Sequence, residues 1–167
     1  YRYATHKGMK VINIVRSEKQ EETLKELGAE YIINSTHENF LETLKKIVDN
    51  LKPTVFLDAI GNEMVSKILR LMPNGSTAVI YGTLAPSDLG LTSMDVLFGA
   101  KTITQFGCPF WLKTLKPEEI KKIVNEIIQD FKEDGRIFGH PIHHIYSHQE
   151  YRSALEDYPK TSSLGKI

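Results

Sequence analysis

Four short segments of this sequence carry the residues most able to do chemistry, and each follows an apolar run typical of a β-strand. They are Val15-Arg16-Ser17, Asp58-Ala59-Ile60-Gly61, Tyr81-Gly82-Thr83 and Phe106-Gly107-Cys108. Open parallel sheets bind their ligands outside the carboxyl ends of the strands. The sequence therefore predicts a ligand site at the edge of a sheet where these turns meet.

Arg16 and Ser17 indicate which ligand this edge would bind. In a classical dinucleotide fold, an acidic residue near this position accepts hydrogen bonds from the adenosine ribose. Here Arg16 follows Val15, and a guanidinium can bind a 2′-phosphate through two parallel hydrogen bonds. Ser17 adds a hydroxyl and a backbone N–H at a helix start, and Lys19 adds a nearby positive charge. We predict NADP(H) rather than NAD(H); the alternative is an ordinary solvated Arg-Ser turn.

The glycine-rich turn that usually cradles a pyrophosphate is not found in this sequence. Gly8 stands alone, and no G-x-G-x-x-G pattern occurs. We therefore expect a nucleotide-binding sheet without its first strand and without that turn.

Alternating strand and helix patterns predict how these turns are positioned. Strands are expected at 10–15, 31–33, 54–57, 77–81 and 102–106, with a strand-like stretch at 141–146. Helices are expected at 1–7, 18–27, 38–51, 64–71, 94–98 and 117–132, and after Ser147. Such alternation is typical of an α/β fold with a doubly wound parallel sheet that helices cover on both faces. We expect one domain over residues 1–167, in which 138–167 returns toward a catalytic domain outside this chain.

Composition excludes several classes of function. Lys and Arg number 21, as do Asp and Glu, so the 167-residue chain has no basic footprint for nucleic acid or for a membrane surface. No apolar run approaches the roughly 18 residues that span a bilayer. Cys108 is the single cysteine, which excludes a disulfide framework. We expect a reducing compartment, the cytoplasm first and the mitochondrion as the alternative.

Several reactive side chains have simpler explanations. His140, His143 and His144 lie close in sequence, but neighbours in a strand point to opposite faces, which disfavours a metal site. Cys108 has no recognisable base beside it, so we expect a buried or idle thiol rather than a nucleophile. Asp58 could bind a cofactor or cap its own turn.

The order of motifs resembles the cofactor domain of medium-chain dehydrogenases/reductases, most of all the zinc-lacking quinone oxidoreductases and trans-2-enoyl-thioester reductases. The motifs are V-I-N-I-V-R-S (11–17), L-G-A-E-Y-I-I-N (27–34), F-L-D-A-I-G (56–61), G-S-T-A-V-I-Y-G (75–82), F-G-C-P-F-W-L (106–112) and L-G-K-I (164–167). No single motif is decisive, but their order and spacing match over nearly the whole chain. The resemblance implies a Rossmann-type domain.

The resemblance also implies roles for individual residues. Arg16 and Ser17 would contact the 2′-phosphate of NADP. The cofactor midsection would lie along Ala59, Ile60 and Gly61, and the nicotinamide half would lie near Gly82 and Thr83. The nicotinamide and substrate cleft would be bordered by Gly107, Phe110 and Trp111, although the two aromatic residues could equally belong to the core. Ser35 departs from the Tyr that many quinone reductases place there to help bind the phosphate.

These features favour an NADPH-dependent reductase that moves hydride to a quinone or an activated enoyl C=C. This chain would be its cofactor-binding portion, with no catalytic residue assigned, because a separate domain supplies most substrate contacts in the resembled family. The alternative is a non-catalytic remnant or split-gene fragment. A methyltransferase-type domain is disfavoured by Arg16, since its strand usually ends in an acid. Relatives suggest a homodimer through the edge of the strand at 102–106.

Overall fold

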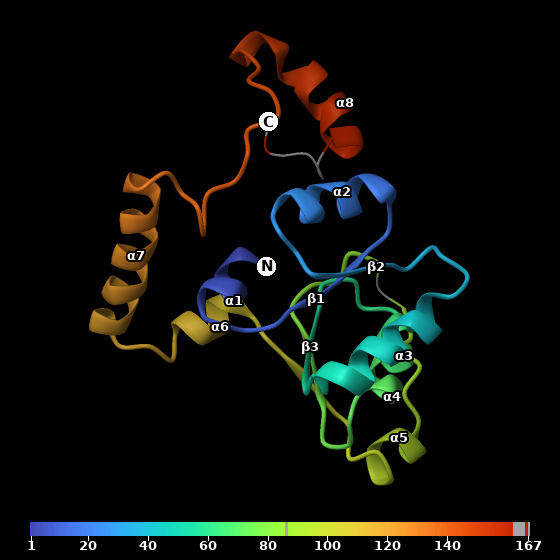
Figure 1. The fold of residues 1–167 in the computed structure, drawn as a ribbon. Helices are drawn as coiled ribbons and strands as arrows, with labels where there is room; N and C mark the ends of the chain where they lie inside the picture. The colour runs from blue at the N-terminus through green and yellow to red at the C-terminus, as the bar shows by residue number, and fades with distance from the viewer. Residues whose placement is uncertain (86, 162–165, 167) are drawn as a thin grey trace.

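The computed structural model describes residues 1–85, 87–161 and 166, and it confirms the predicted α/β fold. Short strands alternate with helices along the chain (Figure 1). The strands are β1 (Ile12–Val15), β2 (Tyr31–Asn34), β3 (Val55–Asp58), β4 (Thr77–Ile80) and β5 (Thr102–Gln105). The helices are α1 (Arg2–His6), α2 (Glu18–Glu26), α3 (Phe40–Leu51), α4 (Met64–Leu71), α5 (Ser93–Leu97), α6 (Cys108–Leu112), α7 (Pro117–Lys132), η1 (His148–Glu150) and α8 (Tyr151–Thr161).

All described strand pairs are parallel, and they form two groups. β1 pairs with β2, while β3, β4 and β5 form a second sheet in that order. In the second sheet Asp58, Ile80 and Gln105 lie at one level, so the turns that follow these strands share one edge. This arrangement brings three of the four predicted turns together.

Helices α3 and α4 cover one face of both sheets and form the core with them. α3 packs against β2 and α4, and α4 packs against β4. Side chains of β1 and β3 reach the same cluster, which joins the two sheets through a common apolar layer. The buried apolar residues are Ile33, Phe40, Leu44, Val48, Val65, Ile68, Leu69, Met72 and Ala78.

The sequence predicts that helices cover both faces of the sheet, but the opposite face of the second sheet carries exposed residues. Val55 and Leu57 of β3 point away from the core and are 59% and 64% exposed. All four residues of β5 are exposed as well. The apolar sequence of β3 therefore does not lead to burial on both faces in the described structure.

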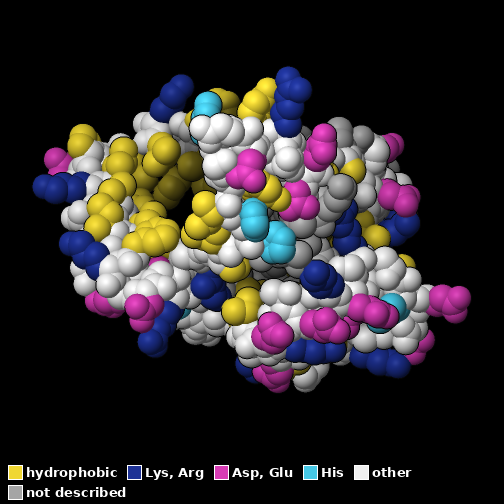
Figure 2. All heavy atoms as spheres, turned by 90° about the horizontal axis from the view of Figure 1, so that it is seen from above, with side chains coloured by type: hydrophobic (Ala, Val, Ile, Leu, Met, Phe, Trp, Pro, Cys, Tyr) yellow, Lys and Arg dark blue, Asp and Glu magenta, His cyan; other side chains and the backbone are white. Residues whose placement is uncertain are grey.

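The C-terminal part of the chain lies away from the sheets. Figure 1 shows α7 and α8 apart from the strands. α7 is tied to α1 by an ion pair in which Lys7 Nζ lies 2.9 Å from Glu126 Oε1. Its exposed apolar residues Val124, Ile128 and Phe131 lie on the flank of α7, where Figure 2 shows hydrophobic side chains gathered. No helix in the described ranges combines the length and the apolar character needed to cross a membrane.

The strand predicted at 141–146 is wrong. Within the described residues, this stretch makes one isolated bridge, between Ile142 and Lys166, and no ladder. The helix predicted after Ser147 is confirmed, since η1 and α8 follow it directly and the Ser147 hydroxyl donates to the Glu150 carboxylate at 2.6 Å. The terminal L-G-K-I motif lies, apart from Lys166, outside the described residues. The division of the chain into one domain with a return segment from 138 stays a prediction.

Candidate functional site

The turn between β1 and α2 exposes the Arg16 side chain beside a helix start. Ser17 caps α2, because its hydroxyl oxygen accepts a 3.4 Å hydrogen bond from the Gln20 N–H. The Arg16 N–H donates in turn to the Gln20 side-chain oxygen at 3.0 Å. These two bonds fix the turn, so the predicted N-cap at Ser17 is confirmed.

The turn after β3 is organised by the Asp58 carboxylate. Its Oδ2 accepts hydrogen bonds from the N–H groups of Ile60 at 3.2 Å and Gly61 at 2.7 Å. Asp58 is buried, and Gly61 has a φ of +75°, which glycine adopts without strain. Of the two interpretations of Asp58, the structure confirms the turn cap.

The turn after β4 lies directly against the turn after β3. N–H groups of the loop from β4 to α5 donate to the carbonyls of this neighbouring turn: Leu84 to Ala59 at 3.1 Å, Ala85 to Ile60 at 3.0 Å and Ser87 to Gly61 at 3.0 Å. A Cβ at Gly82 would lie 2.8 Å from the Ala59 carbonyl oxygen, so only glycine permits this approach. The structure thus brings Ala59–Gly61 and Gly82–Thr83 together.

The turn after β5 forms a short helix, α6, that the sequence interpretation missed. Gly107 is its N-cap, and the N–H groups of Phe110 and Trp111 both donate to the Gly107 carbonyl at 2.9 Å. Pro109 in the first turn was the available signal for a helix start. Phe110 and Trp111 are both exposed, which contradicts the core alternative. Cys108 is exposed as well, so of the expected buried or idle thiol only the idle one stays a prediction.

A hollow of about 300 Å³ lies beside the end of β2, at the start of α3 and α4. The sequence interpretation did not place a site here. Its lining residues are Ser35, His37, Glu38, Asn39, Phe40, Leu41, Glu42, Met64 and Lys67. Ser35, noted above as a departure from related sequences, is among them.

The predicted residues fall into two groups in space. Those after β3, β4 and β5 share the edge of one sheet, whereas Arg16 and Ser17 follow β1 in the other. Within residues 1–85 and 87–161, no hydrogen bond joins the two groups. Across the same residues, no three His, Cys, Asp or Glu side chains are close enough to hold a metal ion.

Comparison with protein families agrees with this geometry. The zinc-binding dehydrogenase family profile matches residues 1–129, which is more than half of the chain. The chain belongs to this family. Its parallel strands and intervening helices match the nucleotide-binding domain of the medium-chain dehydrogenases/reductases.

The relatives of this zinc-binding dehydrogenase domain include enoyl and quinone reductases. The chain is 27% identical over 153 residues to the mitochondrial enoyl-acyl-carrier-protein reductase of Rattus norvegicus, covering 89% of this chain and 40% of that protein. It is 29% identical to a structure assigned as an NADPH:quinone reductase of Mesorhizobium loti, with a TM-score of 0.71, covering 80% of this chain and 38% of that one. A complex of Etr1p with NADP and crotonyl-CoA has the same fold at 21% identity and a TM-score of 0.73, covering 95% of this chain and 47% of that one. The chain therefore spans less than half the length of the relatives it matches.

Proposed function

We propose that this chain is the cofactor-binding portion of an NADPH-dependent reductase that transfers hydride to a quinone or an activated enoyl C=C. The observation that carries the proposal is the exposed Arg16 beside the Ser17-capped start of α2. A guanidinium and a helix N-terminus together attract a phosphate group. The family and the names of the related reductases agree with it.

The residues at the shared edge fit a dinucleotide. The close approach of Gly82 to Ala59 and the left-handed Gly61 let the two turns pack backbone against backbone at this edge. Ala59, Ile60 and Gly61 would line the cofactor midsection, and Gly82 and Thr83 would lie near its nicotinamide half. Gly107 with the exposed Phe110 and Trp111 would border the cleft for nicotinamide and substrate.

When bound, NADPH would supply the hydride, and the residues of this chain would orient it. Arg16 and Ser17 would hold the 2′-phosphate at one end. The turns after β3, β4 and β5 would direct the nicotinamide outward from the sheet edge. We assign no catalytic side chain in this chain, so the substrate contacts and any proton donor would be supplied by residues beyond it.

Replacing Arg16 by Ala should weaken NADPH binding by roughly 10- to 150-fold. The range corresponds to about 1.5–3 kcal/mol for a hydrogen bond to a charged group. NADH has no 2′-phosphate, so its affinity should not change. Calorimetric titration of the wild type and R16A with both cofactors measures the difference. Arg136→Ala is the matched control, because Arg136 is exposed and forms its ion pair with the nearby Asp134.

Equal affinity of the wild type for NADPH and NADH would contradict the role of Arg16. A wild type that unfolds cooperatively on heating but binds neither cofactor would favour the second candidate, a non-catalytic portion of such a reductase. The second candidate has one supporting observation, the exposed apolar residues Val55 and Leu57 on an uncovered sheet face.

We also propose that two copies associate through the outer edge of β5. The N–H groups of Thr102 and Phe106 donate to β4, so those of Ile103 and Gln105 face outward. Sedimentation equilibrium should give twice the 19.0 kDa monomer mass. Gln105→Pro should yield a monomer, because proline removes one outward N–H. Gln129→Ala on α7 is the control, because a proline there would break the helix. A monomeric wild type would contradict this interface.

A further inference from the structure

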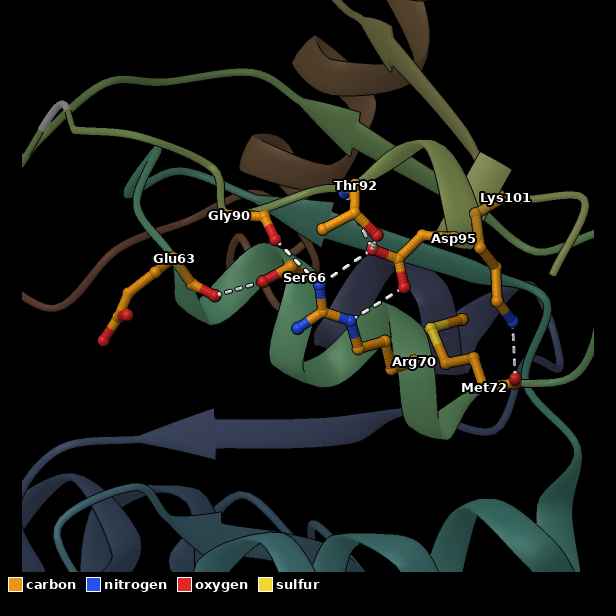
Figure 3. A network of polar contacts seen from close by, with 8 residues as sticks. All are labelled: Glu63, Ser66, Arg70, Met72, Gly90, Thr92, Asp95 and Lys101. Atoms are coloured by element: carbon orange, nitrogen blue, oxygen red, sulfur yellow. Dashed lines mark hydrogen bonds and ion pairs between the residues drawn. The ribbon is translucent and has the colours of Figure 1, made fainter. Parts of the chain in front are cut away.

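The loop between β4 and α5 is fastened at its far end to helix α4 by Arg70. Arg70 Nε and Nη2 donate to the two carboxylate oxygens of Asp95, each at 2.7 Å. Nη2 also donates to the Gly90 carbonyl at 2.8 Å. Figure 3 shows the guanidinium between the loop and the first turn of α5. One side chain of α4 thus binds two points of the segment that leads into α5.

Asp95 is held as firmly from its own side. Its Oδ2 accepts hydrogen bonds from the N–H and the hydroxyl of Thr92, both at 2.8 Å. The Asp95 side chain is only 10% exposed, although that of Arg70 is 44% exposed. The Arg70 guanidinium and the Thr92 groups hold the pKa of the Asp95 carboxyl well below its usual range. The carboxylate therefore stays ionised in the folded protein at neutral and mildly acidic pH.

The loop also packs closely on α4. A Cβ at Gly90 would lie 2.8 Å from Ser66 Oγ, and this hydroxyl donates to the Glu63 carbonyl at 2.9 Å. α4 itself begins directly after the Asp58–Gly61 turn. The helix that carries Arg70 and the turn that faces Gly82 are therefore continuous in the chain.

The near end of the same loop forms part of the proposed cofactor edge. Leu84, Ala85 and Ser87 donate their N–H groups to carbonyls of residues 59–61. Between this end and the start of α5 at Ser93, the described part of the loop has no helix or strand of its own. An irregular segment of this length loses much conformational entropy when it is fixed, so contacts at both ends are needed to hold it.

We propose that Arg70 and Asp95 are a positioning pair: by fastening the loop to α4 they hold Gly82 and Thr83 against Ala59–Gly61 and so set the cofactor affinity of a site that neither residue touches. The inference rests on the proposed function of that site. Ordinary surface ion pairs contribute little. This pair differs because its contact is bidentate, its carboxylate is nearly buried and four donors converge on it.

Amide hydrogen exchange measured by NMR tests the structural half of the proposal. In Asp95→Asn the amides of Leu84, Ala85 and Ser87 should exchange roughly tenfold faster than in the wild type, equivalent to about 1.4 kcal/mol of lost protection. Amides of β2 should keep their wild-type rates. Arg70→Lys, which keeps the charge but loses the two-pronged contact, should give an intermediate rate. The matched control is Asp49→Asn, which breaks an exposed i, i+4 ion pair with Lys45 on α3.

Calorimetric titration with NADPH tests the functional half. D95N should bind NADPH roughly tenfold more weakly than the wild type and D49N, with R70K between them. Unchanged exchange of the loop amides in D95N overturns the proposal, and so does faster exchange with unchanged affinity. Faster amide exchange in β2 as well would also overturn it, because the substitution would then destabilise the whole fold. A wild type that binds no NADPH refutes the proposed function, whereas the exchange data still decide whether the pair holds the loop.

Discussion

Leu44→Ala should lower the free energy of unfolding by about 2–5 kcal/mol. Leu44 lies in the middle of α3 and is 1% exposed, in the apolar layer that joins the two sheets. Truncation removes its buried methyl groups and leaves a cavity between α3, β2 and α4, because tightly packed neighbours relax only in part. Urea unfolding followed by far-UV circular dichroism measures the change.

Leu41→Ala is the matched control on the same helix. Leu41 is 40% exposed, so its truncation should change the free energy of unfolding by less than about 1 kcal/mol. Equal losses in L44A and L41A would contradict the assignment of this layer as the core. A loss in L44A confined to one phase of a biphasic transition would instead show that the two sheets unfold separately.

The repeating elements could be predicted from the sequence because local patterns determine them. α4 and α7 have the predicted bounds, and the five main strands lie where the apolar runs placed them. Ser17, a short polar residue before an amphipathic run, could be recognised as an N-cap because the cap depends on residues three positions apart. Such features need no knowledge of distant residues.

The stretch at 141–146 shows where this reasoning fails. Its apolar residues resemble those of a strand, but a strand also needs a neighbour with which to form a ladder. Ile142 makes only a single bridge to Lys166 in the described structure. The composition of a segment thus indicates whether it suits a sheet but does not reveal whether a partner is present.

The candidate site could be predicted only in part, because some of its contacts are local and others join distant residues. The turns after β3 and β4 could be placed at one edge, because parallel strands end together. Their separation from Arg16 could not, since strand order depends on long-range pairing. The contacts of Arg70 with Asp95 also join residues far apart in sequence, and neither residue type alone indicates them. Assigning these contacts required the structure.

Lys101 is a second residue whose role only the structure reveals. It lies between α5 and β5 and is buried, an unusual position for a lysine. Its Nζ donates to the carbonyl of Met72, directly after the end of α4, at 2.6 Å (Figure 3). It also donates to the carbonyl of Pro73 at 2.7 Å. The last carbonyls of a helix have no partner within it, so Lys101 supplies donors that α4 and its following turn need.

Lys101→Met should lower the free energy of unfolding by about 1–3 kcal/mol. Methionine keeps the apolar stem but leaves the Met72 carbonyl without a donor, at about 1–3 kcal/mol for a buried unsatisfied group. The Pro73 carbonyl keeps the N–H and the hydroxyl of Ser76 as donors. Lys67→Met is the matched control, because Lys67 is an exposed lysine on α4 that forms an ion pair with Glu63. Its replacement should change the free energy of unfolding by less than about 1 kcal/mol. Urea unfolding at neutral pH distinguishes the two variants.

The pH dependence separates a buried ammonium from a simple packing effect. Burial lowers the pKa of Lys101 below its usual 10.5, so the folded protein releases this proton before the unfolded chain does. Between the two pKa values the unfolded chain binds more protons, and the free energy of unfolding should therefore rise with pH as pH approaches 10.5. The neutral amine still has N–H groups to donate to Met72 and Pro73. K101M should lack this rise while K67M retains it, and the same slope in wild type and K101M would contradict the burial of a charged Lys101.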